Sequence, residues 1–164
     1  PWYQSATPRF VLILAPLFAL LWTRLGARQP SSQLKFTICL FLLALAFMVM
    51  IPAARLAAAG RVSPLWLLAL YFLQTCGELC LSPVGLSTFT KLSPPKLVGA
   101  MLGVWFLAAA FGNKFAGVLA SSFGEGDVAH LDKFFSQQAV AVLIVAGIFL
   151  AVVPWVRNRM GGVR

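Results

Sequence analysis

QTCGELCLSPVGLS, residues 74–87, is the stretch that decides the fold. It lies within residues 62–90, whose only charged side chain is that of Glu78. A helix of this length rises about 1.5 Å per residue and spans roughly 43 Å, enough to cross a bilayer core of about 30 Å with some tilt. The sequence therefore predicts a membrane-spanning helix with a carboxyl group near its middle. Such a group is costly unless it faces a polar cavity, a partner or a proton.

The composition indicates an integral membrane protein. Hydrophobic residues make up 60% of the chain, charged residues only 10%, and the mean hydropathy is +0.89. A soluble domain would carry about 25% charged residues. The net charge of +9 does not indicate nucleic-acid binding, because the Lys and Arg are scattered between apolar runs without a basic stripe. We therefore expect the lipid bilayer, and no nucleic acid, as a partner.

We expect an all-α membrane protein with five transmembrane helices, at about residues 7–25, 34–54, 62–90, 97–121 and 134–156. Together they would form one partial transmembrane domain over residues 1–164. Pro94 and Pro95 separate the third helix from the fourth, because two prolines cannot continue a helix. The chain begins at Pro1 without Met or a signal-peptide pattern, so we expect a fragment of a longer protein.

The distribution of Lys and Arg predicts the orientation in the membrane. Five crossings with short loops place the loops on alternating sides. Eight basic residues fall on one side: Arg24, Arg28, Lys35, Lys91, Lys96, Arg157, Arg159 and Arg164. Four fall on the other: Arg9, Arg55, Arg61 and Lys133. The positive-inside rule then makes the first side and the C-terminus cytoplasmic, in a multi-pass protein of the cell (inner) membrane. The loop with Glu125, Asp127 and Asp132 would lie outside.

The third segment has the features of a transporter's substrate site. At 100° per residue, Thr75, Glu78, Ser82 and Gly85 form one polar or small stripe, and Cys80 falls on the opposite side. Pro83 removes a backbone hydrogen bond one turn from Glu78, and broken helices near the midplane are typical of such sites. The alternative is a kinked helix whose Glu78 is protonated, or paired with another helix, for packing alone.

The fourth segment supplies candidates for a facing wall. Gly99 and Gly103 form a GxxxG pair suited to close helix packing. Trp105 is either the aromatic wall of a cavity or a lipid-facing or interfacial residue. Lys114 either snorkels toward the outer interface or contributes, with Asn113, to a gate or polar contact.

No metal site or cofactor is expected. Cys39, Cys76 and Cys80 lie in apolar runs, His130 is the only histidine, and two thiols without a nearby third ligand coordinate a metal poorly. No Ser/His/Asp set or phosphate loop occurs on a common face, so we do not expect an enzyme.

Several motifs follow one another along the chain: WYQS at 2–5 with Pro8, APLFA at 15–19, GEL at 77–79, SPVGLS at 82–87, KL at 91–92 with Pro94, GVWFL at 103–107 and GN at 112–113. Together they resemble the proton-dependent oligopeptide transporter family of the major facilitator superfamily. The resemblance covers nearly the whole chain. It implies helices eight to twelve of a twelve-helix carrier, part of its C-terminal six-helix bundle.

The resemblance also implies residue roles. Glu78 matches the glutamate that binds the peptide's amino terminus, Ser82 the serine one turn on, and Trp105 the tryptophan that forms a wall of the peptide pocket. Thr7 stands where the family usually has asparagine, so it is the weakest of the expected peptide contacts. Lys114 receives no role from the family. The expected partners are small peptides, protons as the coupling ion, and the missing N-terminal half of the carrier.

Two other functions remain open from the sequence. One is a carrier of the same fold for another solute, such as a drug, a sugar or nitrate. The other is a membrane assembly module that does not transport.

Overall fold

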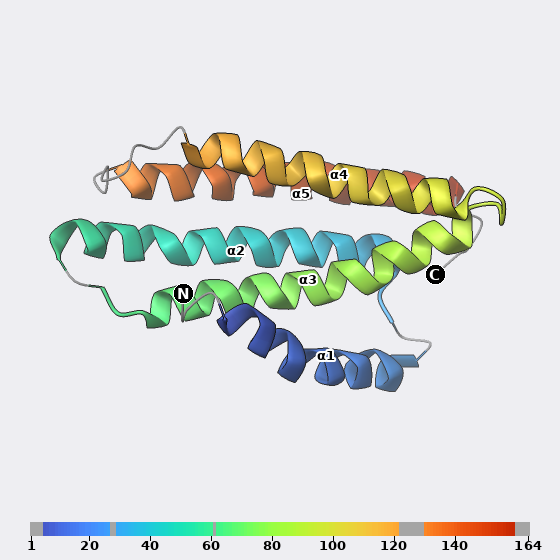
Figure 1. The fold of residues 1–164 in the computed structure, drawn as a ribbon, viewed down its shortest axis with the longest axis horizontal. Coiled ribbons are helices and arrows are strands. Elements are labelled where there is room, and N and C mark those ends of the chain that lie inside the picture. Colours follow the sequence, from blue (N-terminus) through green and yellow to red (C-terminus); the bar gives the residue numbers. More distant parts are fainter. Residues whose placement is uncertain (1–4, 27–28, 61, 122–129, 160–164) are drawn as a thin grey trace. The chain divides into compact units, whose positions relative to one another are not determined.

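The computed structural model describes residues 5–26, 29–60, 62–121 and 130–159. The chain over these residues is helical, without a strand, and five helices are long and apolar enough to cross a membrane. They are α1 (Ala6–Leu25), α2 (Ser32–Ala59), α3 (Leu65–Leu92), α4 (Val98–Ser121) and α5 (Leu131–Arg159) (Figure 1). The predicted all-α membrane fold with five transmembrane helices is confirmed. The acidic residues Glu125 and Asp127, and the basic residues Arg28, Arg61 and Arg164, lie outside the described residues.

Helix α2 is longer than the predicted range 34–54 at both ends. It begins at Ser32 because the Ser31 hydroxyl accepts a hydrogen bond from the Leu34 amide, at 3.4 Å, and so satisfies a free donor of the first turn. At the other end, the charge of Arg55 does not stop the helix. Arginine and alanine are good helix formers, so α2 continues to Ala59 and ends before Gly60, whose φ is 149°.

Helices α3 and α5 also differ from their predicted ranges, 62–90 and 134–156. Helix α3 begins at Leu65, because Pro64 fits a helix start and the Ser63 hydroxyl accepts a hydrogen bond from the Leu65 amide at 3.3 Å. Helix α5 begins three residues before the prediction and carries Asp132 in its first turn, where a carboxylate is favoured by the helix dipole. The starts of α1 and α4 differ by one residue from the prediction.

The chain divides into two compact units, and the division falls inside α3. One unit contains residues 1–82 and 128–164, and the other contains residues 83–127. The boundary lies between Ser82 and Pro83, the position where the sequence predicts a disturbed helix. The α-helix nevertheless runs through Pro83 without a stop. The expectation of one partial transmembrane domain stays a prediction.

The centre of the first unit is the antiparallel pair of α2 and α5. The rings of Phe36 and Phe149 stack with their centroids 5.9 Å apart, which joins the start of α2 to the late part of α5. Arg55 and Asp132 join the opposite ends, with Nε and Oδ2 3.4 Å apart. Small buried residues let the two backbones approach, since Ala46 and Ala146 are completely buried.

The other helices of this unit attach through a few specific contacts. On α3, a β-carbon at Gly77 would lie 3.4 Å from the Cys39 carbonyl oxygen of α2. On α1, Phe10 meets Phe72 of α3 edge to face, with centroids 5.8 Å apart. The Lys35 ammonium of α2 lies 4.3 Å from the ring centre of Trp22 at the end of α1.

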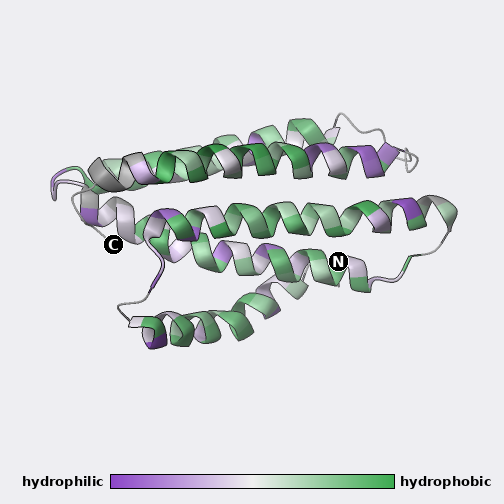
Figure 2. Cartoon of the chain, turned by 180° about the vertical axis from the view of Figure 1, so that it is seen from behind, coloured by the Kyte–Doolittle hydropathy of each residue, from purple (hydrophilic) through white to green (hydrophobic). Residues whose placement is uncertain are grey.

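Hydroxyl groups within the helices bond mainly to their own backbone. The side chains of Thr37 and Thr75 donate to the carbonyls four residues earlier, at 3.1 Å and 2.8 Å. Thr23 and Thr90 do the same. Figure 2 shows helices that are hydrophobic over most of their length, with the stronger hydrophilic colour near several ends.

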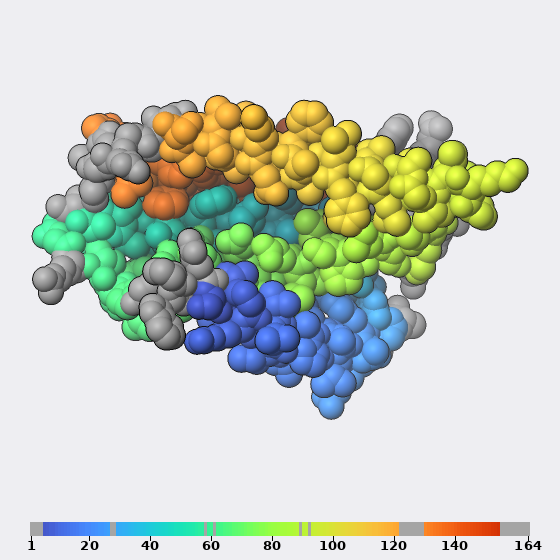
Figure 3. All heavy atoms as spheres, in the orientation of Figure 1, coloured from blue at the N-terminus to red at the C-terminus, as the bar shows by residue number. Residues whose placement is uncertain are grey.

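Helix α4 of the second unit has no buried residue among the described positions. Its aromatic side chains are largely open, and Phe111 and Phe115 are 68% and 65% exposed. Figure 3 shows the side chains of α4, gold to yellow, as a long open row. Such a surface suits contact with lipid or with further apolar helices.

Candidate functional site

Glu78 lies on an exposed face of α3 and has one hydrogen-bond partner within the described chain. The Gln74 amide donates from Nε2 to Glu78 Oε1 at 3.3 Å, across one helical turn. No described Lys or Arg forms an ion pair with it. A neutral amide compensates a carboxylate at membrane depth only in part, so the group calls for a further donor or cation.

The thiols of α3 lie on a different face from Glu78, as the helical geometry predicts. Cys76 and Cys80 are buried, at 9% and 3% exposure, whereas the Glu78 side chain is exposed. Gly77 lies between them and faces Cys39. Across the described residues, no three His, Cys, Asp or Glu side chains come together as a metal-binding group.

The predicted stripe of Thr75, Glu78, Ser82 and Gly85 forms only in part. Glu78 and Ser82 are both exposed and lie one turn apart on α3. Thr75 is completely buried and its hydroxyl donates to the Tyr71 carbonyl, so it is not available to a ligand. Gly85 is buried too. Helical angle alone cannot show this, because it does not say which neighbouring helix covers each position.

Trp105 packs against Gly85 within the second unit. A β-carbon at Gly85 would lie 2.9 Å from Cζ3 and 3.0 Å from Cζ2 of the Trp105 ring. Both distances are below normal carbon contacts, so only glycine leaves room for the indole. The ring is half-buried. Trp105 therefore rests on α3 and still presents part of its surface.

The remaining predicted site residues are spread over both units. Thr7 is half-buried near the start of α1, in the unit that contains Glu78 and Ser82. Asn113 and Lys114 are exposed on α4, in the unit that contains Trp105. The structure thus forms two local groups, Glu78 with Ser82 and Trp105 with Gly85.

Two residues outside the predicted site shape these groups. Gln74 contacts Glu78, and its spacing of four from Glu78 is a local signal that could have identified it, because such residues are neighbours on a helix. Gly85 is predicted only as a small residue of the stripe. Its use as a platform for Trp105 depends on α4, and no local pattern signals that partner.

Comparison with known proteins agrees with this arrangement of helices. The profile of the POT family matches residues 1–139. The chain belongs to the POT family. This confirms the resemblance found from the motifs, and it confirms the prediction of a transporter chain rather than an enzyme.

Two POT family relatives have names that state what they transport. The peptide transporter YePEPT of Yersinia enterocolitica is 38% identical over 164 residues, covering 97% of this chain and 32% of the relative. The di-/tripeptide transporter of Lactococcus lactis subsp. cremoris is 35% identical, covering 99% of this chain and 32% of the relative. This chain therefore spans about a third of the length of these relatives.

A solved POT structure has the same fold. The crystal structure of the peptide transporter POT in complex with sulfate superposes with a TM-score of 0.84 at 38% identity. The match covers 93% of this chain and 30% of that structure. With its five apolar helices, this POT family chain is part of a multi-pass membrane protein.

Proposed function

We propose that this chain is part of a proton-coupled symporter for di- and tripeptides, and that it supplies one wall of the central peptide site. Glu78 is the residue that binds the positively charged amino terminus of the peptide. The relatives named as peptide and di-/tripeptide transporters support this substrate class. The proposal has protons as the coupling ion and includes no metal or cofactor.

The observation that carries this proposal is the incomplete environment of Glu78. Its carboxylate is exposed in the middle of an apolar helix, and within the described residues only a neutral amide donates to it. An amine brought by a peptide would provide the missing positive charge in a site of low dielectric constant. Such a pair is stronger there than in water.

Protonation of Glu78 would help to release the peptide from the site. The ionised carboxylate attracts the peptide amine, and the protonated form does not carry the charge that holds it. Proton binding and amine binding at Glu78 therefore oppose each other, and each lowers the affinity of the other by the same factor.

We propose Ser82 and Trp105 as further peptide contacts of this chain. Ser82 lies exposed one turn from Glu78, where its hydroxyl can donate to or accept from a peptide backbone group. The half-buried indole of Trp105 offers an apolar wall for a side chain. Thr7 would be a weak further contact, and Asn113 and Lys114 would act at a gate or polar contact.

The opposite wall belongs to the N-terminal half of the carrier, which we propose as the partner of this chain. The carrier would lie in the cell membrane with the C-terminus of this chain in the cytoplasm, because eight of the twelve loop and end cations then fall inside.

The variant Glu78→Gln in the complete carrier tests this function. Proton-driven uptake of a dipeptide into vesicles should fall by about tenfold or more, the loss expected when one partner of a buried charge pair is removed. An N-acetylated dipeptide lacks the charged amine, so its weak uptake should change little in the same variant.

Asp132→Asn is the matched control. It removes the other acid of the described residues, which lies at a helix end and pairs with Arg55, so dipeptide uptake should persist. Wild-type rate and affinity in Glu78→Gln would contradict the assigned role. So would an equal loss for free and acetylated peptides.

A further inference from the structure

A hollow of about 300 Å³ lies where the late part of α2 meets the starts of α3 and α5. It belongs wholly to the first unit, and it is independent of Glu78 and of the proposed peptide site. Its lining is almost entirely apolar, and the main contributors are Ala53, Ala54, Ala57, Trp66, Leu131 and Phe135.

The hollow exists because α2 carries small side chains at this end. Ala53, Ala54 and Ala57 fall on one face by helical spacing, and none of them reaches far enough to fill the space beside α3. Large side chains from α3 and α5, those of Trp66 and Phe135, form the other walls. An apolar hollow of this kind suits hydrocarbon better than water.

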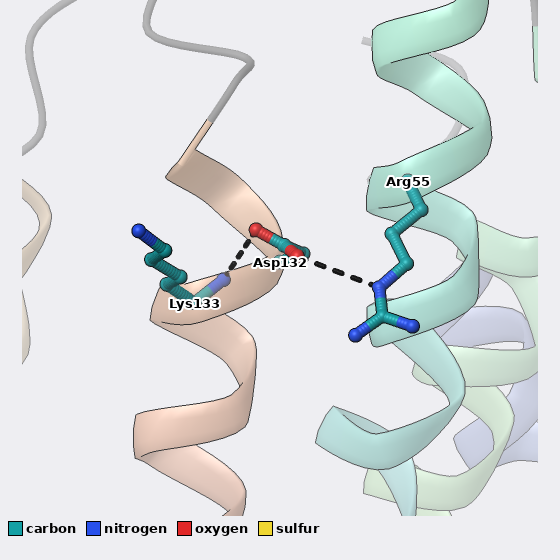
Figure 4. Close-up of polar contacts among 3 residues, drawn as sticks. All are labelled: Arg55, Asp132 and Lys133. Carbon is teal, nitrogen blue, oxygen red and sulfur yellow. Dashed lines mark hydrogen bonds and ion pairs between the residues drawn. The ribbon is translucent and has the colours of Figure 1, made fainter.

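Charged groups lie at the same turns of the helices. Arg55 follows the lining residue Ala54, and Asp132 follows the lining residue Leu131, so their ion pair joins the two helices beside the hollow (Figure 4). Asp132 also accepts a hydrogen bond from the Lys133 backbone amide at 2.8 Å. The side chain of Lys133 points away from α2 and is exposed.

The Arg55 guanidinium has hydrogen-bond donors that no described residue uses. Within the described part of the chain it bonds only to Asp132, and only through Nε. The two terminal nitrogens are uncommitted there, and the side chain is 71% exposed. Arg55 thus has free donors at the edge of the hollow, and a planar guanidinium suits phosphate oxygens.

We propose that the hollow binds one acyl chain of an anionic phospholipid whose phosphate is held by the terminal nitrogens of Arg55. The occupant follows from the combination of an apolar hollow and, at its edge near a helix end, a guanidinium whose terminal nitrogens are uncommitted within the described chain. Helix ends lie at the depth of lipid headgroups. One lipid can therefore place its phosphate at the Arg55 guanidinium and its acyl chain in the hollow. Phosphatidylglycerol has the required charge and shape.

Trp66 makes this binding measurable, because it is part of the lining. The complete carrier, with Trp66 as its only tryptophan, is reconstituted in phosphatidylcholine vesicles. These contain a small fraction of lipid with a brominated acyl chain, which quenches nearby indoles. Brominated phosphatidylglycerol should occupy the hollow about fivefold more strongly than brominated phosphatidylcholine at the same fraction, the preference expected from one basic residue near the headgroups.

Two variants separate the headgroup from the chain. Arg55→Gln should abolish the preference for the anionic lipid and leave a weak, equal quenching by both. Ala54→Phe should fill the hollow and lower quenching by both lipids. Leu56→Phe is the matched control, because Leu56 is exposed and does not line the hollow.

Equal quenching of Trp66 by both lipids in the parent protein would overturn the site. The absence of quenching by either lipid would also do so, since another part of the carrier would then occupy the hollow. Should Ala54→Phe fail to fold, the response of Arg55→Gln alone decides: an undiminished preference for phosphatidylglycerol contradicts the assignment.

Discussion

The indole of Trp105 occupies the space that a side chain at Gly85 would need. The two residues come from α4 and from the second half of α3, and they hold these segments together within one unit. A residue proposed for substrate contact thus has its position set by a residue with no side chain.

Gly85→Ala should displace the Trp105 ring. A new β-carbon would lie 2.9 Å and 3.0 Å from two ring carbons, and overpacking of this kind costs about 1–3 kcal/mol. Thermal unfolding of the purified carrier should occur at a lower temperature, and dipeptide affinity should fall. The control is Gly103→Ala on α4, where nothing in the described chain lies within 4 Å of the new β-carbon. Unchanged stability and affinity in Gly85→Ala would show that the ring does not depend on this contact.

Gly77 should tolerate alanine but not leucine. A β-carbon at this position would lie 3.4 Å from the Cys39 carbonyl oxygen and 3.5 Å from Sγ, which is ordinary contact for one methyl group. Gly77→Ala should be neutral or slightly stabilising, because alanine is the better helix former. Gly77→Leu should separate α2 from α3 and destabilise by about 1–3 kcal/mol. Equal unfolding temperatures for the two variants would contradict this close approach.

The Arg55–Asp132 pair should contribute little to stability. Arg55 is mostly exposed and the atoms are 3.4 Å apart, so we expect a coupling energy below about 1 kcal/mol. A double-mutant cycle with Arg55→Gln and Asp132→Asn measures it, and added salt should reduce it further. A coupling well above that value would indicate that the pair is shielded from water.

Lys35 should contribute more to the stability of the protein than its place near a helix end suggests. Only 7% of it is exposed, its ammonium lies over the Trp22 ring, and it donates to Gln29 Oε1 at 3.0 Å. Lys35→Met should lower stability by about 0.5–2 kcal/mol, the range for a partly desolvated cation over an indole. Lys114→Met is the comparison, since Lys114 is exposed on α4. Equal thermal stability of the two variants would contradict a larger stabilising contribution from Lys35 than from Lys114.

The number and class of the helices can be predicted well from the sequence, because long uncharged runs have few other stable forms in a membrane. Helix ends are harder to predict. The charge of Arg55 suggests a stop, but a charged side chain at an interface can remain inside the last turns of a helix. The Ser31 and Ser63 caps are local signals that improve the predicted starts of α2 and α3.

The candidate site can be predicted at the level of individual residues and not of their contacts. The helical angle separates Glu78 from the buried thiols, because both lie on one rigid helix. It cannot show that Thr75 is covered while Ser82 is open, since burial depends on neighbouring helices that are far away in the sequence. The contact of Trp105 with Gly85 likewise depends on two different helices, so the helical angle cannot predict it.

The threonines that bond to their own helices bear on how the chain enters the membrane during synthesis. Thr75 and Thr90 give their hydroxyl hydrogens to carbonyls of α3 itself, so these groups add little to the cost of moving α3 into lipid. The Glu78 carboxylate has a partner within α3 as well, the Gln74 amide, but a neutral amide compensates a charge only in part. For the insertion machinery Glu78 is therefore the charged residue nearest the middle of α3, where a charge raises the cost of transfer into the bilayer most.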